Sequence, residues 1–477
     1  SESAAKLDVA PGATWPKRGV GRGTSGAIPD RMRSLSVFAC GVLAGCFYEE
    51  ASPLPADFGV CTAPSEGGGV ALPTWYRDVE PIVIQKCQGC HTGGGIAPFT
   101  LEGFTKVASM RGLIREEVST RRMPPWQPDP CCNTYQHDRS LTDAERDTML
   151  NWLEGGTTIG DPADAPPVMP PPTGLPHVDL TATMPVPFTP EPKIGSDELR
   201  CFFLDHAPID RTRYITGFDF KPGVRSMVHH VIVFAIEPDE IERLSKRDGA
   251  DGRPGWDCHG EGGELSINSK YIGGWQPGVL PRVLPDGIGR ELPAGTRIAI
   301  NIHYDTGHGT APDQSSIDIM LEDSVDRLER GIPVGNPLWF AGEGMQIDAG
   351  DPDAWVWFAY DPSAIITRGK SVDLHNVMIH MHELGTVGRA AILRQNGTTE
   401  CLLNITQWDF HWMADYYFET PVRLHPGDKL YVECRWDNSA GNQAIVNGEQ
   451  ETPRDLIWRT DDEMCGAIVL FSEAVDS

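Results

Sequence analysis

The sequence is poor in positive charge, and this shortage excludes a large class of partners. Its 477 residues contain 40 Lys and Arg against 67 Asp and Glu, which gives a formal net charge of −27. No basic run interrupts the acidic balance, so a phosphate backbone would be repelled and we expect no nucleic acid as a partner. Long apolar runs are also missing. The apolar stretch 35–42 is much shorter than the roughly 20 residues that a membrane-spanning helix needs.

Several familiar patterns are absent as well. The chain has no internal repeat and no coiled-coil heptads, and it lacks a Ser-His-Asp set, a phosphate-binding loop and a paired-carboxylate arrangement. Gly and Pro are plentiful, with 51 and 40 residues, which is typical of many short strands joined by turns. The residues left to carry chemistry are His, Met and Cys.

The N-terminal residues 1–46 read as a dispensable leader that ends in a lipoprotein signal. Met32 and Arg33 precede the apolar stretch 35–42, which suits the apolar region of an export signal. Leu43-Ala44-Gly45-Cys46 follows and resembles the lipobox of bacterial lipoproteins, so Cys46 would carry the lipid that anchors the protein to a membrane. The alternative is a small buried turn containing Cys46. We expect an exported protein, periplasmic or on the cell surface, whose twelve cysteines lie where disulfides persist.

Composition divides the remainder into a multidomain chain, with a small all-α domain followed by two antiparallel β-sandwiches of the jelly-roll kind. Residues 47–72 form a tether, and 73–160 a compact helical unit whose last helix begins with a capping box at Thr142 and Glu145. Proline dominates 161–176, which favours a stiff linker. Alternating strands then predict sandwiches at 177–345 and 346–477.

The helical unit carries a c-type haem attachment sequence, Cys87-Gln88-Gly89-Cys90-His91. The region resembles small bacterial cytochrome c domains, in which a Met before a Pro-Pro turn is an axial ligand. This implies haem c on thioethers at Cys87 and Cys90, with His91 and Met123 on the iron. A structural zinc or a disulfide is the alternative for the cysteines, and Met110 or Met149 for Met123.

Histidines and a methionine in the C-terminal half suit copper. In 297–303 three isoleucines share one face of a strand and His303 lies on the other; in 377–382, His380 and His382 share a face. The adjacent His229 and His230 must lie at a bend or bulge, because neighbours on a regular strand face opposite ways. Imidazole with the thioether of Met464 favours a copper that passes through Cu(I).

The region from about Leu199 to Glu473 resembles the ascorbate-dependent type II copper monooxygenases. Four motifs in the family's order carry this resemblance: Val228-His229-His230, Ile302-His303-Tyr304, Ile379-His380-Met381-His382-Glu383-Leu384-Gly385 and Asp462-Glu463-Met464-Cys465. The resemblance implies two copper ions. His229, His230 and His303 would hold an electron-transfer copper, and His380, His382 and Met464 the oxygen-activating copper across an open cleft.

The family also implies two disulfides, Cys434–Cys465 and Cys201–Cys258. Cys131 and Cys132 pair with Cys61 or with each other, and Cys401 has no obvious partner. Met378, on the face of His380, is the competitor of Met464. The remaining C-terminal histidines are assigned to structure or to support of the ligands, and they are His206, His259, His308, His375, His411 and His425.

Two departures bear on the substrate. Peptide-amidating members bind the substrate carboxylate with an Arg and a Tyr, where this chain has Met378 and Ile468. We therefore do not expect peptide amidation, and these residues favour a less polar small molecule, which would be hydroxylated with O2. Electrons would come from an external donor through the haem. The rival interpretations are a copper-binding electron-transfer lipoprotein without oxygenase activity and a cytochrome joined to a ligand-binding sandwich.

Overall fold

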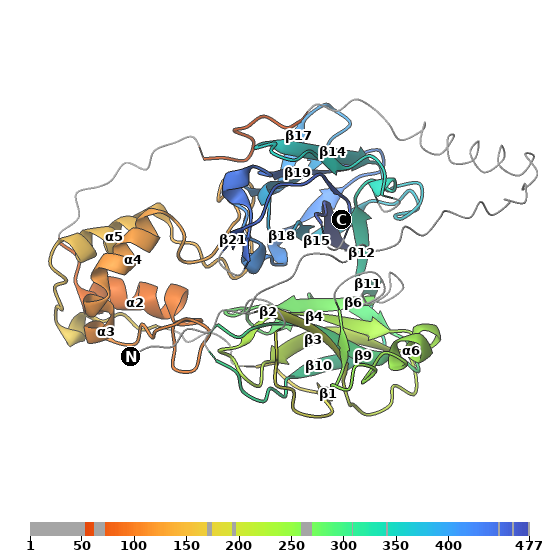
Figure 1. Cartoon of the computed structure of the whole chain (residues 1–477), viewed down its shortest axis with the longest axis horizontal. Coiled ribbons are helices and arrows are strands. Elements are labelled where there is room, and N and C mark those ends of the chain that lie inside the picture. The colour runs from red at the N-terminus through yellow and green to blue at the C-terminus, as the bar shows by residue number, and fades with distance from the viewer. Residues whose placement is uncertain are drawn as a thin grey trace, which may run out of the picture. The chain divides into compact units, whose positions relative to one another are not determined.

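The computed structural model of the chain describes residues 53–61, 72–168, 174–192, 197–258, 270–307, 309–339, 342–446, 449–459 and 462–475. Met32, Cys46, His259 and His308 lie outside these ranges. The described residues belong to one compact unit, 52–477. Helices come first along the chain and strands fill the remainder (Figure 1). Among these residues we find no helix with both the length and the apolar character to cross a membrane.

The N-terminal helices pack around a small aromatic core. They are η1 (Trp75–Val79), α2 (Glu80–Ile82), η2 (Val83–Cys87), α3 (Phe104–Ser109), α4 (Arg111–Ser119), α5 (Asp143–Glu154) and η3 (Pro162–Asp164). Trp75 and Trp152 are almost fully buried, with ring centroids 5.7 Å apart. The capping box at the start of α5 is confirmed, because Glu145 N donates to Thr142 Oγ1 and Thr142 N donates to Glu145 Oε2.

The segment between α4 and α5 leaves the helices and joins the C-terminal strands. Pro128 bridges to Ile405, and Tyr135 bridges to Phe418 and donates its hydroxyl to Leu402 O at 2.7 Å. Disulfides Cys61–Cys131 and Cys132–Cys401 fix this segment, which resolves the pairing that the sequence left open. The described part of the expected tether, 53–61, is also docked, since Leu54 is buried.

The first sandwich consists of two sheets with a shared core. One sheet has the order β1-β10-β3-β8-β11 with β7 beside β3, and the other β5-β2-β9-β4-β6. All of these pairs are antiparallel except β11 with β8. Helix α6 (Pro238–Ser245) follows β4. The strands are β1 (Leu180–Thr183), β2 (Asp197–Phe203), β3 (Arg213–Lys221), β4 (Val228–Ile236), β5 (Trp256–Asp257), β6 (Lys270–Trp275), β7 (Arg282–Val283), β8 (Ile288–Leu292), β9 (Arg297–Asp305), β10 (Ser316–Glu322) and β11 (Arg327–Leu328).

The second sandwich has sheets β12-β23-β15-β18 and β14-β19-β16-β17. Strand β12 lies before the expected boundary at 345/346 yet pairs with β23, so the chain changes sandwich between β11 and β12. The strands are β12 (Arg330–Val334), β13 (Gln346–Ile347), β14 (Ala354–Tyr360), β15 (Val372–His380), β16 (Gly385–Leu393), β17 (Thr399–Ile405), β18 (Tyr416–Leu424), β19 (Lys429–Trp436), β20 (Ile445–Val446), β21 (Glu449–Gln450), β22 (Leu456–Ile457) and β23 (Gly466–Glu473), with short helices η5 (Phe410–Trp412) and η6 (Ala440–Asn442).

Alternation of side chains explains how the sheets pack. On β9, Ile298, Ile300 and Ile302 are fully buried in the core between the two sheets, as their shared face predicts. Ala299 lies on the opposite face and joins a second cluster that includes Leu244 of α6. The implied disulfides Cys201–Cys258 and Cys434–Cys465 are confirmed, the first on the face of Ala299 and the second in the core of the C-terminal sandwich.

Candidate metal centres

Three histidines meet on the second sheet of the first sandwich. His229 and His230 lie at the start of β4, where the pairing register with β9 shifts between Val228 and His230. This irregularity confirms the bend expected from two adjacent histidines. His303 comes from the neighbouring strand β9 and pairs with His230. All three side chains are buried, and we call them the three-histidine site.

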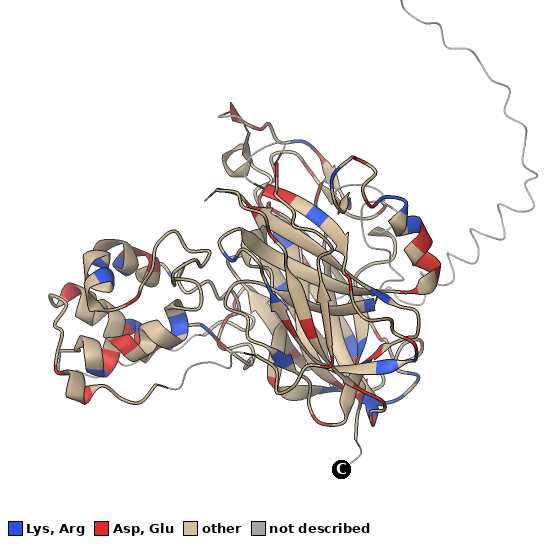
Figure 2. Ribbon diagram, turned by 90° about the horizontal axis from the view of Figure 1, so that it is seen from below, with Lys and Arg blue, Asp and Glu red and all other residues tan. Residues whose placement is uncertain are grey.

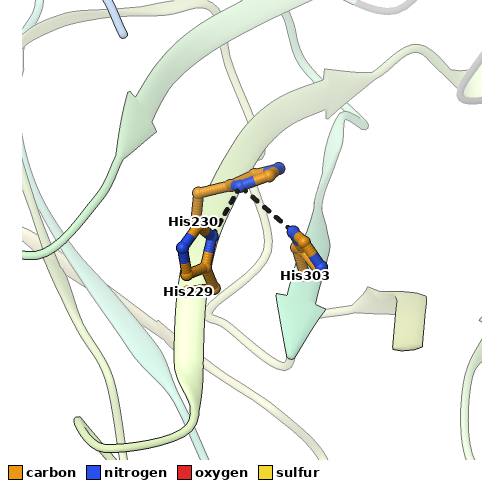
Figure 3. Close-up of side chains that lie close together, drawn as sticks. All are labelled: His229, His230 and His303. Carbon is orange, nitrogen blue, oxygen red and sulfur yellow. Dashed lines mark hydrogen bonds between the residues drawn. The ribbon is translucent and has the colours of Figure 1, made fainter. Parts of the chain in front are cut away.

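The ring nitrogens of the three-histidine site converge as metal ligands do. His230 Nδ1 lies 3.3 Å from the Nδ1 atoms of both His229 and His303 (Figure 3). One Nδ1 carries either one proton or one lone pair, so hydrogen bonding cannot satisfy both contacts. Ligands that bind one tetrahedral ion at about 2.0 Å lie about 3.3 Å apart. The observed spacing therefore fits a shared cation.

The surroundings of the three-histidine site suit metal binding. His303 Nε2 lies 2.8 Å from Asp197 Oδ1, which places the ring proton on Nε2, as carboxylates that support metal-bound histidines do. Burial lowers the pKa of His229 to about 4, with repulsion from His303 added, and lowers the pKa of His230 well below its usual value. Both rings are neutral at pH 7 and able to bind a metal.

A second histidine pair lies at the end of β15 in the other sandwich. The rings of His380 and His382 are 5.1 Å apart, and burial lowers the pKa of His380 to about 3. His382 Nδ1 lies 3.1 Å from the carbonyl oxygen of Asp462, so the lone pair is on Nε2. The buried carboxylate of Glu463 fixes the backbone here, because it accepts hydrogen bonds from His382 N and Leu384 N, both at 2.8 Å. We call His380 and His382 the His380 site.

Two thioethers are relevant to the His380 site. Met464 is 7% exposed and lies between Glu463 and Cys465, and Cys465 is bonded to Cys434 of β19. Among the described residues, no hydrogen bond joins Met464 to either histidine. Met413 Sδ lies 3.1 Å from His380 Nδ1. Local sequence does not predict this contact, because Met413 lies in a loop and His380 ends a distant strand.

The two histidine groups are separated by one aromatic ring. Phe410 of η5 lies 6.4 Å from His230 and 6.0 Å from His382, measured between ring centroids. One side chain, that of Phe410, thus contacts a histidine ring of each group. His411 of the same turn, assigned to structure or support, lies 5.5 Å from His229.

The haem attachment sequence borders a cavity of about 610 Å³, here called the Cys87 cavity. Cys87, Cys90, His91 and Met123 line it, as does Met149, whereas Met110 does not. Cys87 and Cys90 are free thiols, and burial raises the pKa of both. His91 Nδ1 lies 3.0 Å from Phe99 O, which leaves the lone pair on Nε2 for a metal. These residues fit a covalently attached haem.

The wall of the Cys87 cavity extends beyond the helices. His229, Asp305 and Trp412 line the same cavity. His229 belongs to the three-histidine site, and the ring of Trp412 lies 5.9 Å from the ring of His229. Local sequence patterns do not predict this proximity, because the segments that meet here are far apart along the chain.

Residues 364–477 match the family model "Copper type II ascorbate-dependent monooxygenase, C-terminal domain". This range contains His380, His382 and Met464 but not the three-histidine site. The chain is also similar to DBH-like monooxygenase protein 2 of Mus musculus, with 23% identity over 254 residues, half of this chain and 38% of the relative. It therefore spans less than two fifths of that relative's length. Both findings are similarities of part of this chain to monooxygenases, and the family model is one of copper type II enzymes.

Solved structures resemble the chain only distantly. The major capsid protein P2 of bacteriophage PM2 matches at 10% identity and TM-score 0.20, covering 62% of this chain and 98% of the capsid protein. A peptide-N(4)-(N-acetyl-beta-D-glucosaminyl) asparagine amidase matches at 9% identity and TM-score 0.23, covering 62% and 97%. Similarity this low carries no argument about the chain.

Proposed function

We propose that this chain is a copper-dependent monooxygenase that hydroxylates a C–H bond of a small, weakly polar organic substrate with O2. One copper would be held by His229, His230 and His303, and the other by His380, His382 and Met464. The observation that carries the proposal is the pair of imidazole groups that face each other across Phe410, together with the family match over 364–477. Copper bound there supplies one-electron redox chemistry and a position for O2.

The chain's own residues would prepare both sites before any metal arrives. The imidazoles of His229 and His380, whose pKa values burial lowers to about 4 and about 3, bind copper without first losing a proton. Asp197 orients His303, and Glu463 fixes the backbone on both sides of Glu383. Preorganisation of this kind lowers the reorganisation needed when the metal changes oxidation state.

An apolar surface beside the His380 site supports a weakly polar substrate. Met378 and Ile468 are direct cross-strand partners on β15 and β23. They stand where peptide-amidating members of the resembled family have a carboxylate-binding Arg and Tyr. A substrate carboxylate placed here would lose its hydration without gaining a cation, which costs several kcal/mol. A neutral organic molecule fits this wall better.

Electrons would reach copper from a c-type haem held in the same chain, in a cytochrome c domain over 73–160. Cys87 and Cys90 would bind the haem covalently, with His91 and Met123 as axial ligands. Such a ligand pair raises the haem potential and suits an electron carrier that an external donor reduces. The shared wall of the Cys87 cavity, which includes His229, supports a short transfer to the three-histidine site. Cys46 would anchor the exported protein to a bacterial membrane by its lipid.

Isotope labelling tests the proposed function. The full chain, loaded with copper and haem, is given a reductant, 18O2 and a panel of neutral small organic substrates. We expect one labelled oxygen atom in a product, and its loss in His380→Ala and in copper-free protein. His425→Ala, which alters an exposed histidine, is the matched control. Copper and haem that cycle between oxidation states while no product acquires label would instead favour the electron-transfer lipoprotein.

A further inference from the structure

The turn Phe410–Trp412 touches every candidate redox site of the molecule. Trp412 lines the Cys87 cavity and lies 5.9 Å from His229, and Phe410 lies between His230 and His382. The turn is a single helical turn, η5, between β17 and β18. Three consecutive residues of the second sandwich thus contact the helical unit's cavity, the three-histidine site and the His380 site.

Packing against the hydrophobic core does not account for these rings. Phe410 and Trp412 are only partly buried, and neither belongs to a core cluster among the residues that the structure describes. Their ring contacts include the histidines on both sides of the turn. Large aromatic side chains normally stabilise a fold by burying their area, so their position between the sites needs another reason.

Three hydrogen bonds fix the turn and the residues just before it. Asp409 caps it by accepting from His411 N at 3.0 Å, and Gln127 Nε2 of the helical unit's outgoing segment donates to Asp409 O at 2.6 Å. Trp408, just before the turn, donates Nε1–H to His382 O at 3.1 Å. Fixed rings at fixed distances are what a transfer path requires, because electron tunnelling falls steeply with every gap that packed atoms do not fill.

From these contacts we infer that Trp412 and Phe410 are the electron-transfer connections between the redox sites. The inference rests on the proposed function. Trp412 would connect a haem held at the Cys87 cavity to His229, and the electron passed along it would come from reduced haem and be accepted by oxidised copper at the three-histidine site. Phe410 would connect His230 to His382, and the electron passed along it would come from reduced copper at the three-histidine site and be accepted by oxidised copper at the His380 site.

Transient spectroscopy of the whole, metal-loaded chain tests the inference without turnover. Haem is reduced by a light pulse under anaerobic conditions, and its reoxidation is followed by absorbance while Cu(II) is followed by electron paramagnetic resonance. In Trp412→Leu we expect reoxidation of haem by copper to slow at least about tenfold, equivalent to about 1.4 kcal/mol of activation free energy. Trp412→Phe, which keeps a ring, should retain most of the rate. In Phe410→Leu the first step should be unchanged and the second step slowed.

Trp355→Leu, which alters an exposed tryptophan of β14, is the matched control and should transfer as the unaltered chain does. Unchanged Cu(II) spectra and haem absorbance in each variant show that the ligands are intact. Equal rates in the unaltered chain and in Trp412→Leu would overturn the role of Trp412 and leave the proposed function standing. No transfer from haem to copper in the unaltered chain would overturn both the inference and the proposed electron supply.

Discussion

At the scale of single residues, Asp197 is the clearest support of a proposed ligand. Its carboxylate fixes the proton of His303 on Nε2. Loss of such a partner typically lowers metal affinity about 10–100-fold. We expect Asp197→Ala to weaken copper binding at the three-histidine site by that factor and Asp197→Asn, which keeps an acceptor oxygen, to weaken it less. Competition titration with a copper chelator measures both. Affinity at the His380 site is the internal control, and an equal loss at both sites would contradict the local role.

Two methionines compete as the sulfur ligand of the His380 site, and the nitrogen that each histidine offers separates them. His382 uses Nδ1 for Asp462 O, so Nε2 is available for the metal. If His380 also binds the ion through Nε2, its Nδ1 faces away from the ion. Met413, whose sulfur lies at that Nδ1, is then on the wrong side of the ring to be a ligand. We expect the copper–sulfur signal in X-ray absorption of the Cu(I) protein to vanish in Met464→Leu and to persist in Met413→Leu. The reverse pattern would assign the ligand to Met413.

At the scale of elements, the disulfide Cys434–Cys465 ties β19 to the residue after Met464, and its two cysteines are 31 positions apart in the sequence. Removing a crosslink of this kind typically costs about 2–4 kcal/mol of stability. We expect the double variant Cys434→Ala, Cys465→Ala to lower the melting temperature and also to weaken the copper–sulfur signal, because the thioether loses its anchor. Cys201→Ala, Cys258→Ala is the matched control: it should lower the melting temperature and leave that signal unchanged. Equal signals in both double variants would remove the anchoring role.

Local chemistry made several elements predictable. The capping box of α5, the irregular pairing at His229 and His230, and the buried face of β9 follow from neighbouring residues and from side-chain periodicity. Long-range pairing was not predictable in this way. The bridges of Pro128 and Tyr135, the docked segment at Leu54 and the transfer of β12 to the second sandwich depend on contacts between distant segments.

For the candidate sites, too, the residues with a local sequence signal were predictable and the long-range contacts were not. Residue types and motif order singled out the three-histidine site and the His380 site, and the structure brings the members of each histidine group together. Phe410, Trp412 and Met413 were missed as contacts of these sites. They lie in a loop without periodicity, and their importance comes only from the distant elements that surround them.

At the scale of the whole molecule, acidic and basic residues are interspersed along helices, strands and loops (Figure 2). A buried polar network joins the two sandwiches: Asp415 accepts from Tyr271 of the first sandwich and from Asn376 of the second. Burial raises the pKa of Asp415. Polar groups buried in this way are stable only with their partners in place, so the network favours one arrangement of the sandwiches and keeps Phe410 between the histidines.

The central claim is that haem and copper form one electron path within the chain. The most direct measurement follows reoxidation of the pre-reduced haem by air in copper-loaded, copper-free and Met464→Ala protein. We predict that copper accelerates reoxidation and that Met464→Ala abolishes the gain, because electrons then have no oxygen-activating copper to reach. Identical rates in all three samples would contradict the account and assign the haem to another electron acceptor.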